Sequence, residues 1–409
     1  MMTIMTMEVV VTQQLWAGVD AGKSDHHCVV IDAEGNRLLS QRIPNDESSL
    51  LQVIQAVTRL ADGGEVTWAV DLNHGGAALL ITLLITADQR LLYIPGRTVY
   101  HASGGYRGDG KTDAKDAAVI ADQARMRRDL QPLRPGDEIA VDLRILTARR
   151  SDLVADRTRA INRLRAQLLE YFPALERAFD YSSSKAALIL LTGYQTPDGL
   201  RRAGVTRLAA WLRKRKARNA DGVAAAAIEA ANAQHTIVPG QQLAAAMVGR
   251  LAKEVMTLDT EIGATDVMIE DRFRRHRHAE IILSMPGFGV ILGAEFLAAT
   301  GGDMTAFDSV DRLAGVSGLA PVPRDSGRIS GNLKRPRRYD RRLLRTCYLS
   351  AQIAIRTDPA SRTYYDRKRA EGKTHTQAVL ALARRRLNVL WAMLRDHAVY
   401  RPATTTAAA

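Results

Sequence analysis

Four aspartates occupy positions from which their carboxylates could act together. Asp20 ends an apolar segment that is typical of a strand, and Asp71 ends a second such segment. Asp113 and Asp116 stand three residues apart at the start of an expected helix, so they share one helix face. We expect the two strands to lie side by side in one sheet, so that Asp20 and Asp71 emerge at one edge and all four carboxylates point toward the same spot.

Such a set of carboxylates has a specific chemical use. Four negative charges near one point repel each other unless cations lie between them, and carboxylate oxygens suit Mg²⁺ or Mn²⁺. Two Mg²⁺ ions ~3.5–4 Å apart would neutralise the set and polarise a phosphodiester from both sides. Taken singly, each aspartate is more often a cap or turn residue, and Asp113 could simply cap its helix. Gly22, just after Asp20, would let a ligand approach the backbone.

A second group of reactive residue types lies near the C-terminus, where Ser326 stands among glycines and cations. Ser326-Gly327 and Ser330-Gly331 alternate with basic residues in this segment. A serine hydroxyl becomes nucleophilic when a base or cation lowers its pKa, and phosphoryl transfer needs positive charge around the phosphate oxygens. The alternative is that both Ser-Gly pairs are ordinary turn residues. If Ser326 is not the nucleophile, Ser330 is the fallback.

The basic character continues into a following helix. Residues 324–345 contain nine Lys or Arg against two Asp, a density that predicts salt-dependent binding to a nucleic-acid backbone. Upstream, Met285–Gly289 breaks an apolar helix (281–299) with one proline and two glycines, resembling a helix-hairpin-helix turn whose free amides can hold phosphate. The expected nucleic-acid contacts are Gly287, Gly289, Arg324, Arg328, Lys334, Arg335, Arg337, Arg338, Arg341 and Arg342.

The distribution of charge supports a division of labour. The chain has a formal net charge of +13 over 409 residues, which favours a polyanionic partner. Residues 1–135 carry 13 Lys or Arg against 16 Asp or Glu, whereas residues 271–409 carry 25 against 12.

The two cysteines are far apart and form no metal pair. The N-terminus does not resemble a secretory signal, and the longest apolar run, Ala77–Ala87, is too short to span a membrane. We therefore expect a cytoplasmic protein that binds nucleic acid.

The order of elements predicts an α/β domain followed by helices. Strands are expected at 15–20, 27–31, 37–43, 66–71 and 91–94, with helices at 48–60 and 77–85 between them and a helix from 113 to about 128. Three meander strands followed by β/α alternation is the order of the RNase H-like fold. Several superfamilies share that order, so it does not by itself indicate a function.

Helices are predicted for the rest of the chain. Apolar residues from Ile139 to Tyr171 recur at spacings of three and four, which predicts a long helix with a coiled-coil-like seam, although Arg150 and Arg157 fall on seam positions. An intramolecular hairpin and a dimer contact explain this seam equally well. A second long helix, 242 to about 273, should pack back on the first, and 182–242 is expected to be helical.

These patterns divide the chain into five segments. We expect a flexible N-terminus (1–14), an RNase H-like catalytic domain (15–131), a helical, coiled-coil-like linker domain (136–277), a C-terminal, mostly helical, serine-bearing domain (278–400) and a flexible tail (401–409).

The motifs at both ends resemble one known family and cover most of the chain. Gly18-Val19-Asp20, the strand-end Asp71 and the helix start Lys111-Thr112-Asp113-Ala114-Lys115-Asp116 resemble the DEDD tetrad of RuvC-like transposases in the insertion-sequence 110 family. The segments 283–289, 307–321 and 324–331 resemble the transposase domain of that family, including its Ser-Gly motif. The family usually has Glu at the second tetrad position, where this chain has Asp71.

The resemblance implies a DNA recombinase that mobilises an insertion sequence. It implies a composite active site in which metal-bound carboxylates lie next to Ser326, and a covalent phosphoserine intermediate. It also implies dimers that pair into a tetramer and targeting by a structured guide RNA, a bridge RNA.

Three alternatives remain at this stage. An RNase H-like nuclease of the Holliday-junction-resolving type would use water as the attacking group, with Ser326 a turn residue. A non-catalytic nucleic-acid-binding protein could retain the fold. An actin-like or sugar-kinase relative would need glycine-rich loops for ATP, and the sequence contains none that is convincing.

Overall fold

The computed structural model describes residues 13–107, 110, 112–133, 137–307, 309–328 and 330–402. The expected flexible ends, 1–14 and 401–409, lie largely outside these described residues. The chain divides into two compact units, residues 1–135 and 136–409, and each unit is described by itself.

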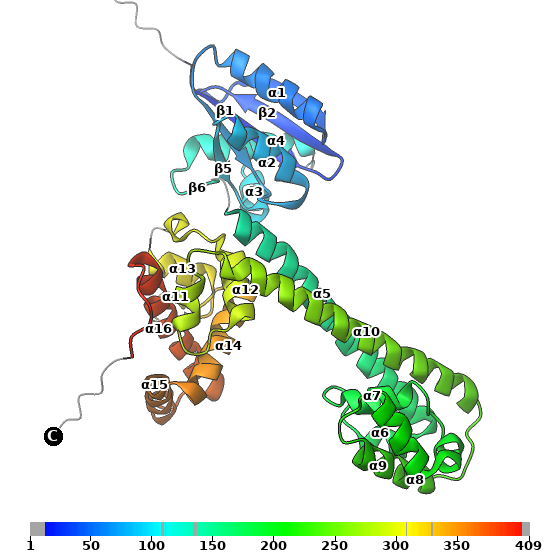
Figure 1. The fold of residues 1–409 in the computed structure, drawn as a ribbon. Helices are drawn as coiled ribbons and strands as arrows, with labels where there is room; N and C mark the ends of the chain where they lie inside the picture. The colour runs from blue at the N-terminus through cyan, green and yellow to red at the C-terminus, as the bar shows by residue number, and fades with distance from the viewer. Residues whose placement is uncertain are drawn as a thin grey trace, which may run out of the picture. The chain divides into compact units, whose positions relative to one another are not determined.

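The N-terminal unit is built on a mixed sheet (Figure 1). Its strands are β1 (Leu15–Ala21), β2 (Asp25–Ile31), β3 (Arg37–Pro44), β4 (Val66–Val70), β5 (Arg90–Tyr93) and β6 (Gln131–Pro132). They lie in the order β3-β2-β1-β4-β5-β6. The predicted meander is confirmed, since β1 to β3 pair antiparallel, and β1 and β4 are parallel neighbours as predicted. The short β6 was not predicted from the sequence.

Helices cover both faces of this sheet. They are α1 (Glu47–Leu60), α2 (Ala78–Thr86, preceded by the 3₁₀ turn η1, Gly75–Ala77), α3 (Gly96–Ser103) and α4 (Asp113–Met126). Alternate strand residues face opposite sides. Val19 of β1 packs in one apolar cluster with Val57 of α1, and Trp16 packs in the other with Ile120 of α4. The helix α3 was not predicted from the sequence.

Two long helices open the second unit. The helices α5 (Glu138–Tyr171) and α10 (Gln241–Arg274) run side by side and antiparallel, as the expected hairpin requires (Figure 1). The arginines on the apolar seam find acids on the partner helix: Arg150 pairs with Asp266 and Arg157 with Asp259. The long helices therefore pack within one chain, and the dimer contact remains a prediction.

A small helical bundle connects the two long helices. Its helices are α6 (Pro173–Ala178), α7 (Lys185–Leu191), α8 (Pro197–Lys214) and α9 (Ala220–Asn232). Their apolar side chains share one core with the adjoining ends of α5 and α10. The prediction that 182–242 is helical is therefore confirmed for most of the segment.

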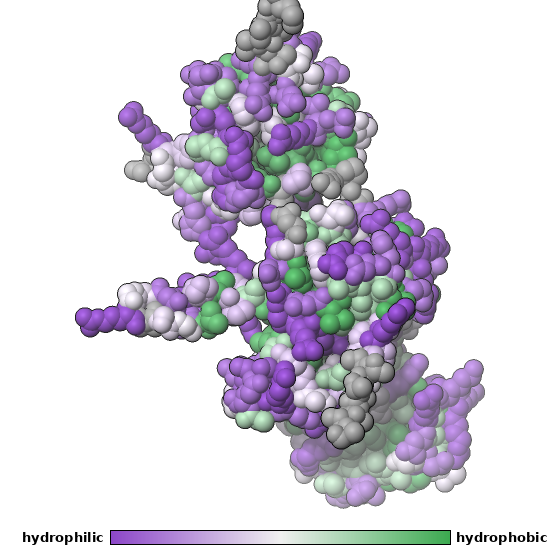
Figure 2. All heavy atoms as spheres, turned by 90° about the vertical axis from the view of Figure 1, so that its left-hand side faces the viewer, coloured by the Kyte–Doolittle hydropathy of each residue, from purple (hydrophilic) through white to green (hydrophobic). Residues whose placement is uncertain are grey.

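The C-terminal part of the second unit is also mostly helical. It contains α11 (Ala279–Ser284), α12 (Val290–Thr300), the 3₁₀ turn η2 (Met304–Ala306), α13 (Val310–Val316), a hairpin of β7 (Val322–Pro323) and β8 (Leu333–Lys334), α14 (Arg341–Thr357), α15 (Pro359–Ala370) and α16 (His375–Arg395). One core joins α11, α12, α14 and α16 to the end of α10. Hydrophilic side chains predominate on the face drawn in Figure 2, with hydrophobic ones in small separate areas. Among the described residues, no helix combines the length and apolar character needed to cross a membrane.

Candidate active site

The first two aspartates lie at adjacent strand ends. Val19 of β1 is the register partner of Val70 of β4, so Asp20 and Asp71 are the next residues along two parallel neighbours. The Ala21 backbone N–H donates a hydrogen bond to Asp71 Oδ1 at 3.1 Å and ties the two ends together. Both carboxylates are half-buried. The structure thus brings together the two strand-end aspartates that the sequence singled out.

The other two aspartates belong to the first turn of α4. Thr112 is the N-cap of this helix, and its hydroxyl accepts a hydrogen bond from the Lys115 N–H at 3.2 Å. Asp113 is therefore not the cap that the alternative interpretation required. Carboxylates in a first turn are also favoured by the positive end of the helix dipole. Asp113 is exposed and Asp116 half-buried.

A glycine sets the distance between α4 and β1. A Cβ atom on Gly18 would lie 2.3 Å from both the Ala117 carbonyl oxygen and the Ala121 nitrogen, closer than atoms can approach. Only glycine therefore lets the backbone of α4 pack directly on the strand that carries Asp20. The same contact brings the start of α4 to the sheet edge where Asp20 and Asp71 lie.

Electrostatics link the aspartates that the fold brings together. Burial raises the pKa of Asp71, the hydrogen bond from Ala21 opposes this rise, and the negative charge of Asp116 adds to it. A cation between Asp71 and Asp116 would remove this repulsion. Within the described residues, however, no three Asp, Glu, His or Cys side chains stand close enough together to enclose a metal ion as they are placed. The donor set suits a hard divalent cation, and enclosing one requires the side chains to turn toward each other.

One glycine has a different role from the one expected. The sequence suggested that Gly22 leaves space for a ligand, but a Cβ there would lie 2.2 Å from the Asp25 carbonyl oxygen. The tight turn between β1 and β2 fills this space. Gly22 is therefore required by the turn.

Sequence reasoning missed a histidine at the site. His27 of β2 is the register partner of Asp20, so the two side chains lie on the same face of the sheet. The ring nitrogen Nε2 of His27 lies 3.0 Å from the Ser40 hydroxyl. Burial lowers the pKa of His27, and the nearby Asp113 carboxylate opposes that shift. Only the register of β1 against β2 distinguishes His27 from His26, and the sequence does not contain that register.

Ser326 lies on the β7–β8 hairpin of the second unit. The Arg324 N–H donates to the Asn332 carbonyl at 2.9 Å, and the Asn332 N–H donates to Asp325 Oδ1 at 2.9 Å. Ser326 and Ser330 are both exposed beyond these bonds. Gly327 and Gly331 have φ angles of 50° and 79°, which favour glycine. In the part of the chain that the structure describes, no side chain is hydrogen-bonded to the Ser326 hydroxyl.

The expected nucleic-acid-binding cations surround this hairpin in sequence and are exposed. Arg345, which closes the basic run, pairs with Glu295 at 3.0 Å. The remaining cations of the run form no ion pair with any described residue: Arg324, Arg328, Lys334, Arg335, Arg337, Arg338, Arg341 and Arg342. Uncompensated charge at this density suits phosphate binding.

The two glycines in the turn between α11 and α12 have different surroundings. Gly287 has a φ of 84°, and a Cβ there would lie 2.3 Å from the Ser350 carbonyl of α14. Close packing on α14 thus explains this glycine without a phosphate. Gly289 is the exposed N-cap of α12, where backbone amides point outward. Phosphate contact at either position remains a prediction.

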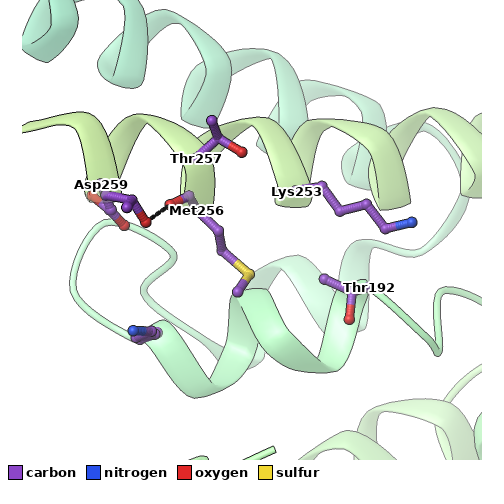
Figure 3. Close-up of a pocket in the computed structure, with 7 residues that line it drawn as sticks. Thr192, Lys253, Met256, Thr257 and Asp259 are labelled. Atoms are coloured by element: carbon purple, nitrogen blue, oxygen red, sulfur yellow. Dashed lines mark hydrogen bonds between the residues drawn. The ribbon is translucent and has the colours of Figure 1, made fainter.

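A pocket of about 530 Å³ lies elsewhere, between α7 and α10 (Figure 3). It is lined by Lys185, Thr192, Lys253, Met256, Thr257, Asp259 and Thr260. The Met256 side chain extends from α10 toward α7, and Asp259 is already bound by Arg157. The pocket contains no predicted site residue, so we give it no part in the candidate active site.

Comparison with known proteins gives concordant matches along the chain. Residues 17–173 match a family model described as a transposase, and residues 279–366 match the model of the transposase IS116/IS110/IS902 family. The chain is 80% identical over 397 residues to the insertion element IS900 uncharacterized 42 kDa protein of Mycobacterium paratuberculosis, covering 97% of this chain and 100% of that protein. It is 52% identical over 390 residues to the insertion element IS116 uncharacterized 44.8 kDa protein of Streptomyces clavuligerus, covering 95% and 97%. It is 28% identical over 392 residues to the mini-circle putative transposase for IS117 of Streptomyces coelicolor, covering 92% of each chain.

The matches define the class of the protein as a transposase, an enzyme that cuts and joins DNA. The chain belongs to the IS116/IS110/IS902 family of transposases. The family resemblance predicted from the aspartate and serine motifs is confirmed.

Proposed function

We propose that this transposase mobilises its insertion element with a composite active site. Asp20, Asp71, Asp113 and Asp116 of an RNase H-like domain form one part, and Ser326 forms the other. The observation that supports the proposal most is the meeting of two strand ends with the first turn of α4 at one sheet edge. In a family of DNA-cutting enzymes, this arrangement of carboxylates is suited to phosphodiester chemistry.

The carboxylates would hold divalent cations, Mg²⁺ or Mn²⁺ and two per site. Bound there, the cations would polarise the scissile phosphate and neutralise the charge that develops on its oxygens. The charge of Asp116, which raises the pKa of Asp71, supports this assignment, because a carboxylate repelled by a neighbouring carboxylate gains from a cation between them.

Ser326 would supply the attacking oxygen. Its Oγ forms a bond to phosphorus as the hydroxyl loses its proton, and the bond between phosphorus and the leaving sugar oxygen breaks. That oxygen takes up a proton, and the strand remains attached to the protein as a phosphoserine. A free hydroxyl of a second strand then attacks the same phosphorus, which restores Ser326 and joins the strands. The exposed position of Ser326 on the hairpin is suited to such attack.

The surrounding cations would hold the DNA backbone, and Arg324 and Arg328 lie nearest to Ser326 in sequence. Arginine binds phosphate oxygens with two parallel hydrogen bonds, which fixes a strand in register. Because the carboxylates and Ser326 belong to different units, domain or subunit assembly would complete the site. We propose the dimer and tetramer, and a guide RNA as the source of target choice, on the family resemblance.

The carboxylate half of this proposal is tested by charge removal. Asp20→Asn and Asp116→Asn should each abolish strand cleavage and joining while DNA binding stays nearly unchanged, since neither residue belongs to the cationic surface. The matched control is Glu47→Gln, which removes an acid from the first turn of another helix in the same unit and should retain activity. Cleavage by wild type should require Mg²⁺ or Mn²⁺ and stop with a chelator. Undiminished recombination by either aspartate variant would remove that residue from the site.

The guide RNA is tested by treating the purified protein with ribonuclease. Targeted recombination should be lost and should return when RNA transcribed from beside the coding region is added. Full targeted activity after complete RNA removal would contradict this part of the proposal.

A further inference from the structure

We propose that the connection between α8 and α9 carries a second nucleic-acid contact, separate from the cations around Ser326. Six cations without a single acid lie between positions 207 and 218. This set, the α8–α9 basic cluster, consists of Arg207, Arg213, Lys214, Arg215, Lys216 and Arg218. All six are exposed.

Most of this charge is uncompensated. Arg213 forms an ion pair with Asp221 at the start of α9. The other members of the cluster form no ion pair with any residue in the described part of the chain. Elsewhere in the second unit many exposed arginines do have acidic partners, as Arg149 has Glu261 and Arg274 has Glu270. The cluster therefore differs from an ordinary charged helix surface.

One cation of the cluster is held in place by an aromatic ring. The Arg215 guanidinium lies over the Trp211 ring, 3.7 Å from the ring centre. The Trp211 ring is itself fixed. It packs edge-on against the Tyr194 ring, with 5.2 Å between the ring centres, and it occupies the space that a side chain at Gly193 would need. One guanidinium N–H donates to the Trp211 carbonyl oxygen at 3.4 Å, and stacking leaves the other N–H groups at the edge of the guanidinium for phosphate oxygens. A side chain that is already ordered loses less entropy when it binds.

The backbone of the connection is also ordered. Lys216 and Asn219 have φ angles of 55° and 52°, a left-handed conformation that asparagine adopts readily but that is costly for lysine. The Lys216 N–H donates to the Arg213 carbonyl at 2.9 Å, and the Ala217 N–H donates to the Leu212 carbonyl at 3.1 Å. These bonds hold the connection in a shape that presents consecutive cations to solvent.

The end of a helix does not by itself explain six cations. A helix C-terminus carries a partial charge of about −0.5, which one or two basic residues in the last turn already complement. Arg213 and Lys214 provide these, while Arg215, Lys216 and Arg218 follow the end of α8. Exposed cations in excess of nearby acids favour a polyanion, which gains affinity by releasing counterions. In a DNA-cutting enzyme that polyanion is a phosphodiester backbone, of DNA or of RNA.

The position of the cluster makes it a separate contact. It lies in the α6–α9 bundle, at the end of the α5 and α10 pair opposite to the helices α11–α16 that flank the Ser326 hairpin. Each long helix has 34 residues, which corresponds to about 50 Å. Binding at the cluster therefore adds phosphate contacts that the cations around Ser326 do not make.

The test compares two triple variants of the full chain. The cluster variant carries Arg215→Gln, Lys216→Gln and Arg218→Gln, and leaves the Arg213–Asp221 pair intact. The control carries Arg163→Gln, Arg177→Gln and Arg250→Gln, which removes the same charge from exposed arginines scattered over α5, α6 and α10. The affinity for a labelled duplex DNA and for a labelled RNA hairpin of unrelated sequence is measured across a salt series without divalent metal. Thermal denaturation checks that both variants are folded.

The cluster variant should bind more weakly than the control, with a shallower dependence of log affinity on log salt. For duplex DNA each lost phosphate contact reduces the slope by roughly 0.9, so three contacts reduce it by roughly 2–3. A change confined to one probe identifies that nucleic acid as the ligand. Slopes and affinities equal to the control for both probes would overturn the proposal and leave an acidic protein surface as the partner of the cluster. Because the readout requires no cleavage, it stands apart from the proposed catalytic function.

Discussion

At the residue scale, Asp71 is where this chain departs from the usual family pattern, which has Glu. Its carboxylate accepts a hydrogen bond from the Ala21 N–H, and the negative charge of Asp116 raises its pKa. These interactions support our proposal that Asp71 belongs to the carboxylate set in spite of its shorter side chain. The assignment of Asp71 as a metal ligand can therefore be tested by changing its length and its charge separately.

We predict that Asp71→Glu retains transposition and that Asp71→Ala is inactive, because only the first keeps an anionic oxygen at the end of β4. The measurement is the rate of strand exchange at several Mg²⁺ concentrations. For Asp71→Glu, this rate should still reach a plateau as the Mg²⁺ concentration rises. Equal activity of the two variants would show that Asp71 is not a ligand.

The four aspartates could be predicted because apolar strands and a helix start define their positions locally. His27 and Gly22 could not be understood in the same way. The role of His27 depends on the register between β1 and β2, and that of Gly22 on the Asp25 carbonyl across a turn. Both roles depend on how two backbone segments lie against each other, and this cannot be read from a single sequence.

At the scale of elements, the contact between α4 and β1 determines where Asp113 and Asp116 lie. Gly18→Ala would place a methyl group against the backbone of α4, and such overpacking typically costs about 1–3 kcal/mol. We predict that this variant is less stable to urea and also loses strand cleavage, because α4 must move away from β1.

The control for this substitution is Gly263→Ala, in the middle of α10, where a Cβ would meet nothing within 4 Å. Alanine favours a helix more than glycine does, so this variant should be as stable as wild type or more stable. A Gly18→Ala protein with wild-type stability and activity would contradict the proposed role of the close contact.

The junction between α10 and α11 contains buried histidines that should make stability depend on pH. His276 and His278 are each 3% exposed, and the His278 ring also stacks on His397. Burial, with the neighbouring His276, Arg277 and His397, lowers the pKa of His278 to about 4, and only Asp137 opposes this. Burial also lowers the pKa of His276, against the effect of Asp137.

Since the folded protein disfavours the charged rings, their contribution to stability is present above the ordinary pKa of 6.5 and is lost as the pH falls toward 4. We predict that the melting temperature decreases over this range and that His278→Phe makes the decrease shallower. His235→Phe, at an exposed position, is the control. An unchanged pH profile for His278→Phe would contradict this account.

The apolar stripe of α5 shows that a sequence pattern can predict a helix without identifying the partner on which the helix packs. Arg150 and Arg157 interrupt an apolar stripe, so the sequence favoured neither a hairpin nor a dimer. Asp266 and Asp259 lie opposite them because α10 runs antiparallel at one particular register. The α6–α9 bundle connects the two helices and shares a core with their ends, and the sequence indicated its helices only in outline.

At the scale of the whole molecule, the separation of charge could be predicted from composition alone. Acids predominate in residues 1–135 and cations toward the C-terminus. The structure assigns these regions to different compact units, with the aspartates in the first and Ser326 in the second. The proposed composite active site would therefore require cooperation between units, and this is the central claim to be tested.

The most direct test is a denaturing gel of end-labelled DNA incubated with wild type, Ser326→Ala, Ser330→Ala and Asp20→Asn in Mg²⁺. If Ser326 attacks phosphorus with help from the carboxylates, the covalent protein–DNA adduct appears with wild type and Ser330→Ala, and is lost with Ser326→Ala and Asp20→Asn. If the attacking group were water instead, the Ser326→Ala variant would still nick DNA. An adduct that persists in Ser326→Ala would contradict the composite site.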